Sequence, residues 1–129
     1  MSDAARFLWI CLAGAIGTGM RHLVGVWAGN RFGVSFPFGT LIVNLAGSFL
    51  IGLVSAIALA VASFPPTLRL VITTGFLGGF TTYSSFNHET MRLFEEGARA
   101  YAVLNLGITV VGSLIAGLLG LALGRALAG

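Results

Sequence analysis

The chain has 129 residues, of which 57% are hydrophobic and 9% are charged, and its seven basic and four acidic side chains give a formal net charge of +3. Soluble domains carry roughly 25% charged residues, so this composition excludes a soluble enzyme or nucleic-acid-binding module and predicts an integral membrane protein. The basic residues are all arginines scattered singly, so their expected partners are membrane lipid headgroups and not nucleic acid.

Four membrane-spanning helices in a single all-α domain, residues 1–129, account for the whole chain. The predicted spans are 4–29, 38–62, 67–94 and 98–126. No charged residue lies in the gap from Arg31 to Arg69 or from Arg99 to Arg125. Each gap exceeds the roughly 20 apolar residues that cross a bilayer. Two consecutive prolines at 65–66 separate the second span from the third, because they cannot continue a helix.

The arginines predict no fixed orientation in the membrane. Four spans place both termini on one side. That side holds Arg6, Arg69 and Arg125, and the opposite side holds Arg21, Arg31, Arg92 and Arg99. Orientation is normally fixed by an excess of Arg and Lys on one side, and here there is almost none. We therefore expect the chain to insert both ways round and to pair as a dual-topology, antiparallel homodimer.

The first span carries Arg21 near its end, and small residues recur in the first and fourth spans. Arg21 either attracts anions at a pore mouth or extends to lipid headgroups. GxxxG pairs, which let helix backbones approach closely, occur at Gly25 with Gly29 and at Gly120 with Gly124. These pairs are compatible with contact between two subunits or with packing inside one chain.

The second span carries a polar stripe. Thr40, Asn44 and Ser48 lie four residues apart and therefore share one helix face. The Asn44 amide needs hydrogen-bond partners that hydrocarbon does not supply, so it faces either a cavity or a neighbouring helix.

The third span is unusual at residues 78–86, with the sequence GGFTTYSSF. Gly78 and Gly79 loosen the backbone, and hydroxyl side chains alternate with aromatic rings after them. Irregular backbone at bilayer depth persists only where it is buried in protein or lines a water-filled path. We therefore expect this helix to be broken at residues 78–82 and the segment to form a permeation or binding site.

The fourth span has a second polar stripe, which steps by four residues over roughly 18 Å. Its members are Tyr101, Asn105, Thr109 and Ser113. The stripe either lines a path or packs against another helix, since Ser and Thr also bond to their own helix. Neutral hydroxyl and amide donors suit an anion that must bind and leave again. The chain has no nucleophile–base pair and no nucleotide loop, which argues against an enzyme.

Two motifs resemble the Fluc/CrcB family of fluoride channels. Residues 78–86 are similar to the GGxTTFSTF motif of that family, and residues 39–52, GTLIVNLAGSFLIG, are similar to its G-x4-N-x2-G-x-F-x2-G pattern. A weaker third match is Tyr101 with Asn105. Tyr83 stands where the family usually has phenylalanine, and Ser85 stands where it usually has threonine.

The resemblance implies an antiparallel homodimer with two fluoride pathways and a central structural Na⁺ ion on the dimer axis. Backbone carbonyls at the break of the third helix hold that ion, at positions that match Gly78 and Thr81. The implied fluoride pathway comprises Asn44, Tyr83, Ser84, Ser85, Phe86, Tyr101, Asn105, Thr109 and Ser113. A family glutamate also matches Glu89, for which no role is assigned.

The resemblance further implies passive fluoride efflux through a multi-pass protein of the cell (inner) membrane. Two alternatives stay open on the sequence. A small multidrug-type proton-coupled antiporter needs an acid inside the membrane, and the centres of the first three spans carry none. A non-conducting membrane assembly subunit explains the glycines but not the two polar stripes.

Overall fold

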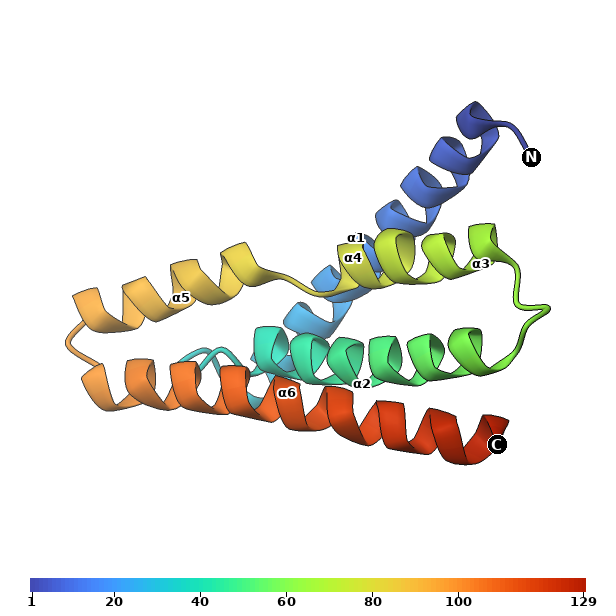
Figure 1. The fold of residues 1–129 in the computed structure, drawn as a ribbon. Coiled ribbons are helices and arrows are strands. Elements are labelled where there is room, and N and C mark those ends of the chain that lie inside the picture. The colour runs from blue at the N-terminus through green and yellow to red at the C-terminus, as the bar shows by residue number, and fades with distance from the viewer.

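A computed structural model describes residues 1–129, in which every regular element is a helix. The elements in chain order are α1 (Asp3–Phe32), α2 (Phe38–Ala60), α3 (Pro66–Leu70), η1 (Val71–Leu77), α4 (Gly78–Phe80), α5 (Tyr83–Glu95) and α6 (Arg99–Ala128). The predicted all-α class is confirmed. The helices α2 and α6 lie side by side, α3 to α5 follow one another in a row, and α1 crosses the others obliquely (Figure 1).

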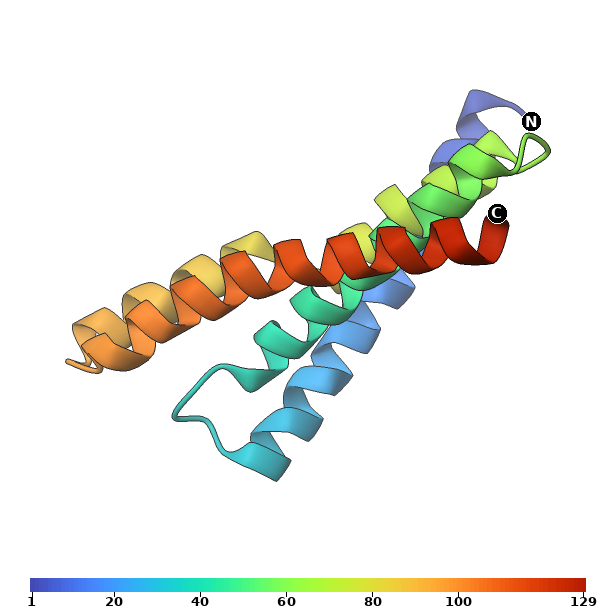
Figure 2. The same cartoon turned by 60° about the horizontal axis from the view of Figure 1, so that its bottom comes forward.

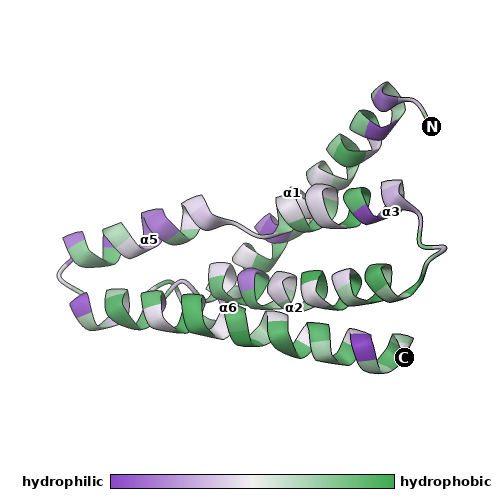
Figure 3. Cartoon of the chain, viewed as in Figure 1, coloured by the Kyte–Doolittle hydropathy of each residue, from purple (hydrophilic) through white to green (hydrophobic).

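Three of these helices, α1, α2 and α6, are long and apolar enough to cross a membrane. The row from α3 to α5 provides the fourth helical segment. Hydrophobic residues cover most of α2 and α6, whereas hydrophilic residues gather on α5 (Figure 3). Both termini lie at the same end of the molecule (Figures 1 and 2). The chain is therefore a multi-pass membrane protein.

Glycines let α6 lie directly on α2. A Cβ atom at Gly120 would run into the Phe49 carbonyl, and one at Gly52 would run into the Gly117 carbonyl. The Gly120–Gly124 pair therefore serves packing within the chain. At Gly25, in contrast, a Cβ atom would meet nothing within 4 Å. The two predicted GxxxG pairs thus have different surroundings.

The helix α1 makes an equally close contact with η1 and α4. A Cβ atom at Gly17 would run into the backbone of Phe76 and Phe80, and one at Gly79 would run into the backbone of α1. Without side chains between them, α1 and the third helical segment are held backbone to backbone. This contact fixes the position of the segment just before residues 81 and 82.

The third helical segment changes geometry twice. Residues 71–77 form a π-helix, which the sequence did not predict. Thr81 and Thr82 are then extended, with φ/ψ of −89°/161° and −153°/125°. We call these two residues the Thr81–Thr82 interruption. It is narrower than the predicted break at 78–82, because Gly78–Phe80 is still helical.

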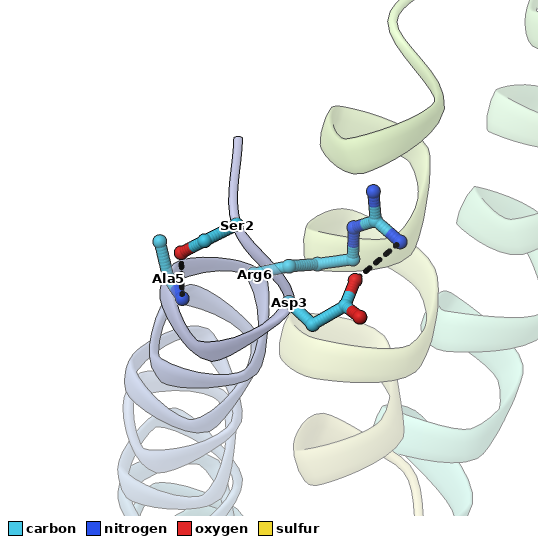
Figure 4. A network of polar contacts seen from close by, with 4 residues as sticks. All are labelled: Ser2, Asp3, Ala5 and Arg6. Atoms are coloured by element: carbon cyan, nitrogen blue, oxygen red, sulfur yellow. Dashed lines mark hydrogen bonds and ion pairs between the residues drawn. The ribbon is translucent and has the colours of Figure 1, made fainter.

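Local signals in the sequence account for where the helices begin and end. The Ser2 hydroxyl accepts a hydrogen bond from the Ala5 N–H at the start of α1, and Asp3 and Arg6 form an ion pair of 3.9 Å on the first turn (Figure 4). Gly97, with φ of 80°, ends α5 in a conformation that favours glycine. The turn to α6 follows directly.

Candidate functional site

A groove of about 280 Å³ lies where α2, the Thr81–Thr82 interruption, α5 and α6 meet. Its lining consists of Asn44, Ser48, Thr81, Thr82, Tyr83, Phe86, Thr109, Val110 and Ser113. Five of the predicted pathway residues are among them, namely Asn44, Tyr83, Phe86, Thr109 and Ser113. The polar groups in the groove are hydroxyls and amides, and none of the lining side chains carries a charge.

Asn44 is bound to the backbone of the interruption. Its Oδ1 accepts from the Thr82 N–H at 2.8 Å, and its Nδ2 donates to the Thr82 carbonyl at 2.9 Å. In a continuous helix the Thr82 N–H would donate to the Gly78 carbonyl. The Asn44 amide thus replaces the helical hydrogen bond and satisfies both backbone groups of Thr82.

The two rings of the motif have different surroundings. Phe86 is 4% exposed, whereas Tyr83 is 78% exposed. Their centroids are 5.9 Å apart and their planes are inclined by 72°, which is an edge-to-face arrangement. Phe86 therefore belongs to the interior of the chain, and Tyr83 projects from its surface.

The polar stripe of α6 divides into three parts. Asn105 and Thr109 are buried and hydrogen-bonded to each other, with the Thr109 hydroxyl donating to Asn105 Oδ1 at 3.3 Å. The Ser113 hydroxyl is buried in the groove wall without a hydrogen-bond partner. Tyr101 is 45% exposed and packs edge-on against Phe36, outside the groove lining. Ser113 is therefore the member of the stripe whose buried hydroxyl has no partner within the chain.

A second cleft, of about 480 Å³, lies between α1, α2 and α5. It contains Arg21 and Ser85 together with the partly buried Glu89. Arg21 Nε donates to the Gly79 carbonyl at 2.9 Å, and the Thr40 hydroxyl donates to Glu89 Oε1 at 2.7 Å. Arg21 is thus anchored to the segment before the interruption, with its remaining N–H groups available to the cleft. Ser84 is exposed and lines neither cavity.

The amino-acid sequence matches one known family over most of its length. Residues 8–121 match the family described as CrcB-like protein, Camphor Resistance (CrcB). The chain belongs to this family. The resemblance predicted from the motifs at 39–52 and 78–86 is confirmed.

Relatives of this CrcB-family chain carry a functional name. A protein named Fluoride-specific ion channel FluC from Sorangium cellulosum is 50% identical over 122 residues, which cover 95% of this chain and 96% of the relative. A protein of the same name from Anaeromyxobacter sp. (strain K) is 50% identical over 125 residues, covering 97% and 99%. Another, from Citrifermentans bemidjiense, is 46% identical over 122 residues, covering 95% and 98%.

The interruption also changes the backbone carbonyls of this CrcB-family chain. Because Thr82 bonds to Asn44, the Gly78 carbonyl receives no N–H from four residues further on. Thr81 closes its own turn, since both its N–H and its hydroxyl donate to the Leu77 carbonyl. Its own carbonyl lies in the extended stretch. The interruption removes the helical partners of several carbonyls, those of Gly78 and Thr81 among them, and the Gly79 carbonyl accepts from Arg21 Nε instead.

Three residues that the predicted pathway does not include also organise the site. The Thr82 hydroxyl accepts from the Ser85 N–H and caps α5, Ser48 lines the groove, and Thr90 bonds to Asn105. Ser48 follows Asn44 by four residues on the second-span stripe, so its position was foreseeable. Thr90 follows Phe86 at the same spacing, but its partner belongs to another helix and no sequence pattern joins the two.

Proposed function

We propose that this chain forms a fluoride-selective channel that gives passive fluoride efflux across the cell (inner) membrane and lowers cytoplasmic fluoride. The observation that carries the proposal is the full-length similarity to relatives named Fluoride-specific ion channel FluC. The groove between α2, α5 and α6 supports it, because its neutral donors bind an anion weakly enough to release it.

The chemistry of fluoride explains why a passive channel is sufficient. Neutral HF crosses lipid and ionises in the cytoplasm, where the anion is trapped. A membrane potential that is negative inside then drives the anion outward with about 2.3 kcal/mol per 100 mV. The pathway needs no nucleotide and no coupled proton. In our proposal, Ser113 and the edge of the Phe86 ring contact the anion, and the free N–H groups of Arg21 attract it to the second cleft.

We further propose that the channel is an antiparallel homodimer with two pathways. The exposed Tyr83 ring at the groove supports this arrangement, because a large aromatic side chain beside an uncharged polar groove is covered when a second copy packs there. The carbonyls of Gly78 and Thr81 from both copies would hold a structural Na⁺ ion at the dimer axis. Carbonyl oxygens suit a hard monovalent cation, and these two are freed from helical bonding.

Fluoride flux is the first test. Purified protein in liposomes loaded with potassium fluoride is expected to release fluoride once valinomycin supplies a path for K⁺, because the anion current needs a counter-current. Release followed with a fluoride electrode should reach completion within minutes. Liposomes loaded with potassium chloride should release no more chloride than protein-free liposomes.

The controls separate the channel from a leak. Phe86→Ile keeps an apolar side chain but removes the ring edge, and it is expected to lower the fluoride rate at least about tenfold while the protein elutes as the wild type does. Equal release of chloride and fluoride, or no fluoride release by the wild type, contradicts the proposed function.

Membrane orientation is the second test. A cysteine added after Gly129 in a Cys11→Ser background should react with a membrane-impermeant maleimide from outside in about half of the molecules, because the arginines divide almost evenly between the two sides. Two lysines in place of Ala128 and Gly129 add positive charge to one side and should shift labelling to one face. Labelling of the unaltered sequence on one face alone contradicts dual topology.

A further inference from the structure

We propose that Thr90 is a positioning residue that sets the direction of the hydrogen bonds beside the groove, and thereby the strength with which Thr109 binds an anion. The inference rests on the proposed function, since the anion is fluoride. Thr90 does not line the groove and is 4% exposed. It acts through Asn105, which is 1% exposed.

The bonds form one buried chain from α5 to α6. The Thr90 hydroxyl donates to the Phe86 carbonyl at 2.8 Å, and Asn105 Nδ2 donates to Thr90 Oγ1 at 2.9 Å. Thr109 Oγ1 then donates to Asn105 Oδ1 at 3.3 Å. All of these groups except the Phe86 carbonyl belong to side chains that are at least nine-tenths buried.

The proton directions in this chain follow from its first acceptor. A carbonyl only accepts, so the single hydroxyl proton of Thr90 must go to Phe86. The Thr90 oxygen therefore accepts from Asn105, and the amide group of Asn105 must turn its nitrogen toward Thr90. Its oxygen consequently faces Thr109. Thr90 thus fixes the orientation of the Asn105 amide without touching the groove.

This orientation determines what Thr109 offers to an anion. With Asn105 Oδ1 beside it, the Thr109 proton is engaged, and an anion in the groove must compete for it. The Thr109–Asn105 bond is the longest of the three, so it is the one that an anion breaks most easily. The competition keeps binding weak, which a fast pathway requires. The unpartnered Ser113 hydroxyl, one turn further along α6, has no such competitor.

Removing the Thr90 hydroxyl should reverse the orientation of the Asn105 side-chain amide. In Thr90→Val, Asn105 Nδ2 loses its acceptor in a buried site, and rotation of the amide lets that nitrogen donate to Thr109 Oγ1. The Thr109 proton is then free to point into the groove. An anion gains a hydrogen bond without breaking one, which corresponds to about fivefold tighter binding.

The experiment measures fluoride release from liposomes against fluoride concentration for the wild type, Thr90→Val and Thr90→Ser. We expect Thr90→Val to lower the half-saturating concentration and the maximal rate, each about fivefold, because a more tightly held anion leaves more slowly. Thr90→Ser keeps the hydroxyl and should match the wild type in both. A structural defect alone would lower the rate and leave the half-saturating concentration unchanged, and that result overturns the inference.

A second background tests the route through Thr109. In Thr109→Val, the Thr90→Val and Thr90→Ser variants should give the same concentration dependence, because no Thr109 proton is left to redirect. A difference that persists in this background also overturns the inference.

If Thr90→Val does not fold, Thr90→Ala removes the same hydroxyl with less bulk, and the same results are expected of it. A wild type that releases no fluoride contradicts the proposed function, whereas identical Thr90→Val and Thr90→Ser curves with a conducting wild type contradict only the role of Thr90.

Discussion

Replacing Gly17 with alanine is expected to lower the free energy of unfolding by about 3 kcal/mol, the upper part of the range for overpacked sites. The added Cβ atom would run into the carbonyl of Phe76 and lie 2.9 Å from the backbone nitrogen of Phe80. Neither group can rotate away, as a flexible side chain would. The substitution therefore forces α1 away from η1 and α4. Titration with sodium dodecyl sulfate in mixed micelles, followed by far-UV circular dichroism, measures the change.

Gly19 provides a matched control two residues further along the same helix. A Cβ atom there would meet nothing within 4 Å. Gly19→Ala should leave the free energy of unfolding unchanged or raise it by up to about 1 kcal/mol, because alanine favours the helix over glycine. Equal effects of the two substitutions would mean that α1 does not contact η1 and α4 as described.

Replacing Asn44 with leucine is expected to lower the free energy of unfolding by about 4 kcal/mol and to abolish fluoride release. Leucine also branches at Cγ, but it removes both hydrogen bonds to Thr82. The Thr82 N–H and carbonyl would then lie inside the membrane without partners, and each such group costs about 1–3 kcal/mol. The same detergent titration and the liposome assay measure the two effects.

Thr73→Val is the control for this substitution. Its hydroxyl also donates to a backbone carbonyl, but that carbonyl belongs to Arg69 in the same helical segment. The loss of that bond leaves no group of another helix unpaired. The free energy of unfolding should therefore change by no more than about 0.5 kcal/mol. If the Asn44→Leu protein unfolded at the same detergent fraction as the wild type, the backbone of Thr82 would not depend on Asn44.

Much of the fold is predictable because it depends on local patterns. Uncharged stretches set the helices, two prolines separate the second from the third, and Gly97 ends α5. The π-helix at 71–77, which packs closely against α1, has no local signal in the sequence and was not predicted. The exact residues of the interruption depend on where the distant Asn44 bonds, which no local pattern shows.

In the site, too, local patterns predict some features and contacts between distant residues determine the others. Spacing by four residues predicted that Asn44 lies on the polar face of the second span and that Thr109 and Ser113 share a face of the fourth, and these three residues line one groove. Spacing alone could not show that Tyr101 packs outside it, since a stripe longer than the contact between two helices continues past the site. It also could not distinguish a hydroxyl that is already bonded, as at Thr109, from one that is free, as at Ser113.

The Asn44–Thr82 pairing has a consequence for how the protein is assembled in the membrane. The two residues are separated by 38 positions and belong to different spans. An isolated third span in lipid would leave the extended backbone at Thr82 unsatisfied, so it must enter the bilayer as a continuous helix. The interruption then forms only when the second span docks against it. The groove is therefore expected to form only after the second and third spans have met, and a third span that has not yet met its neighbour has no groove to expose.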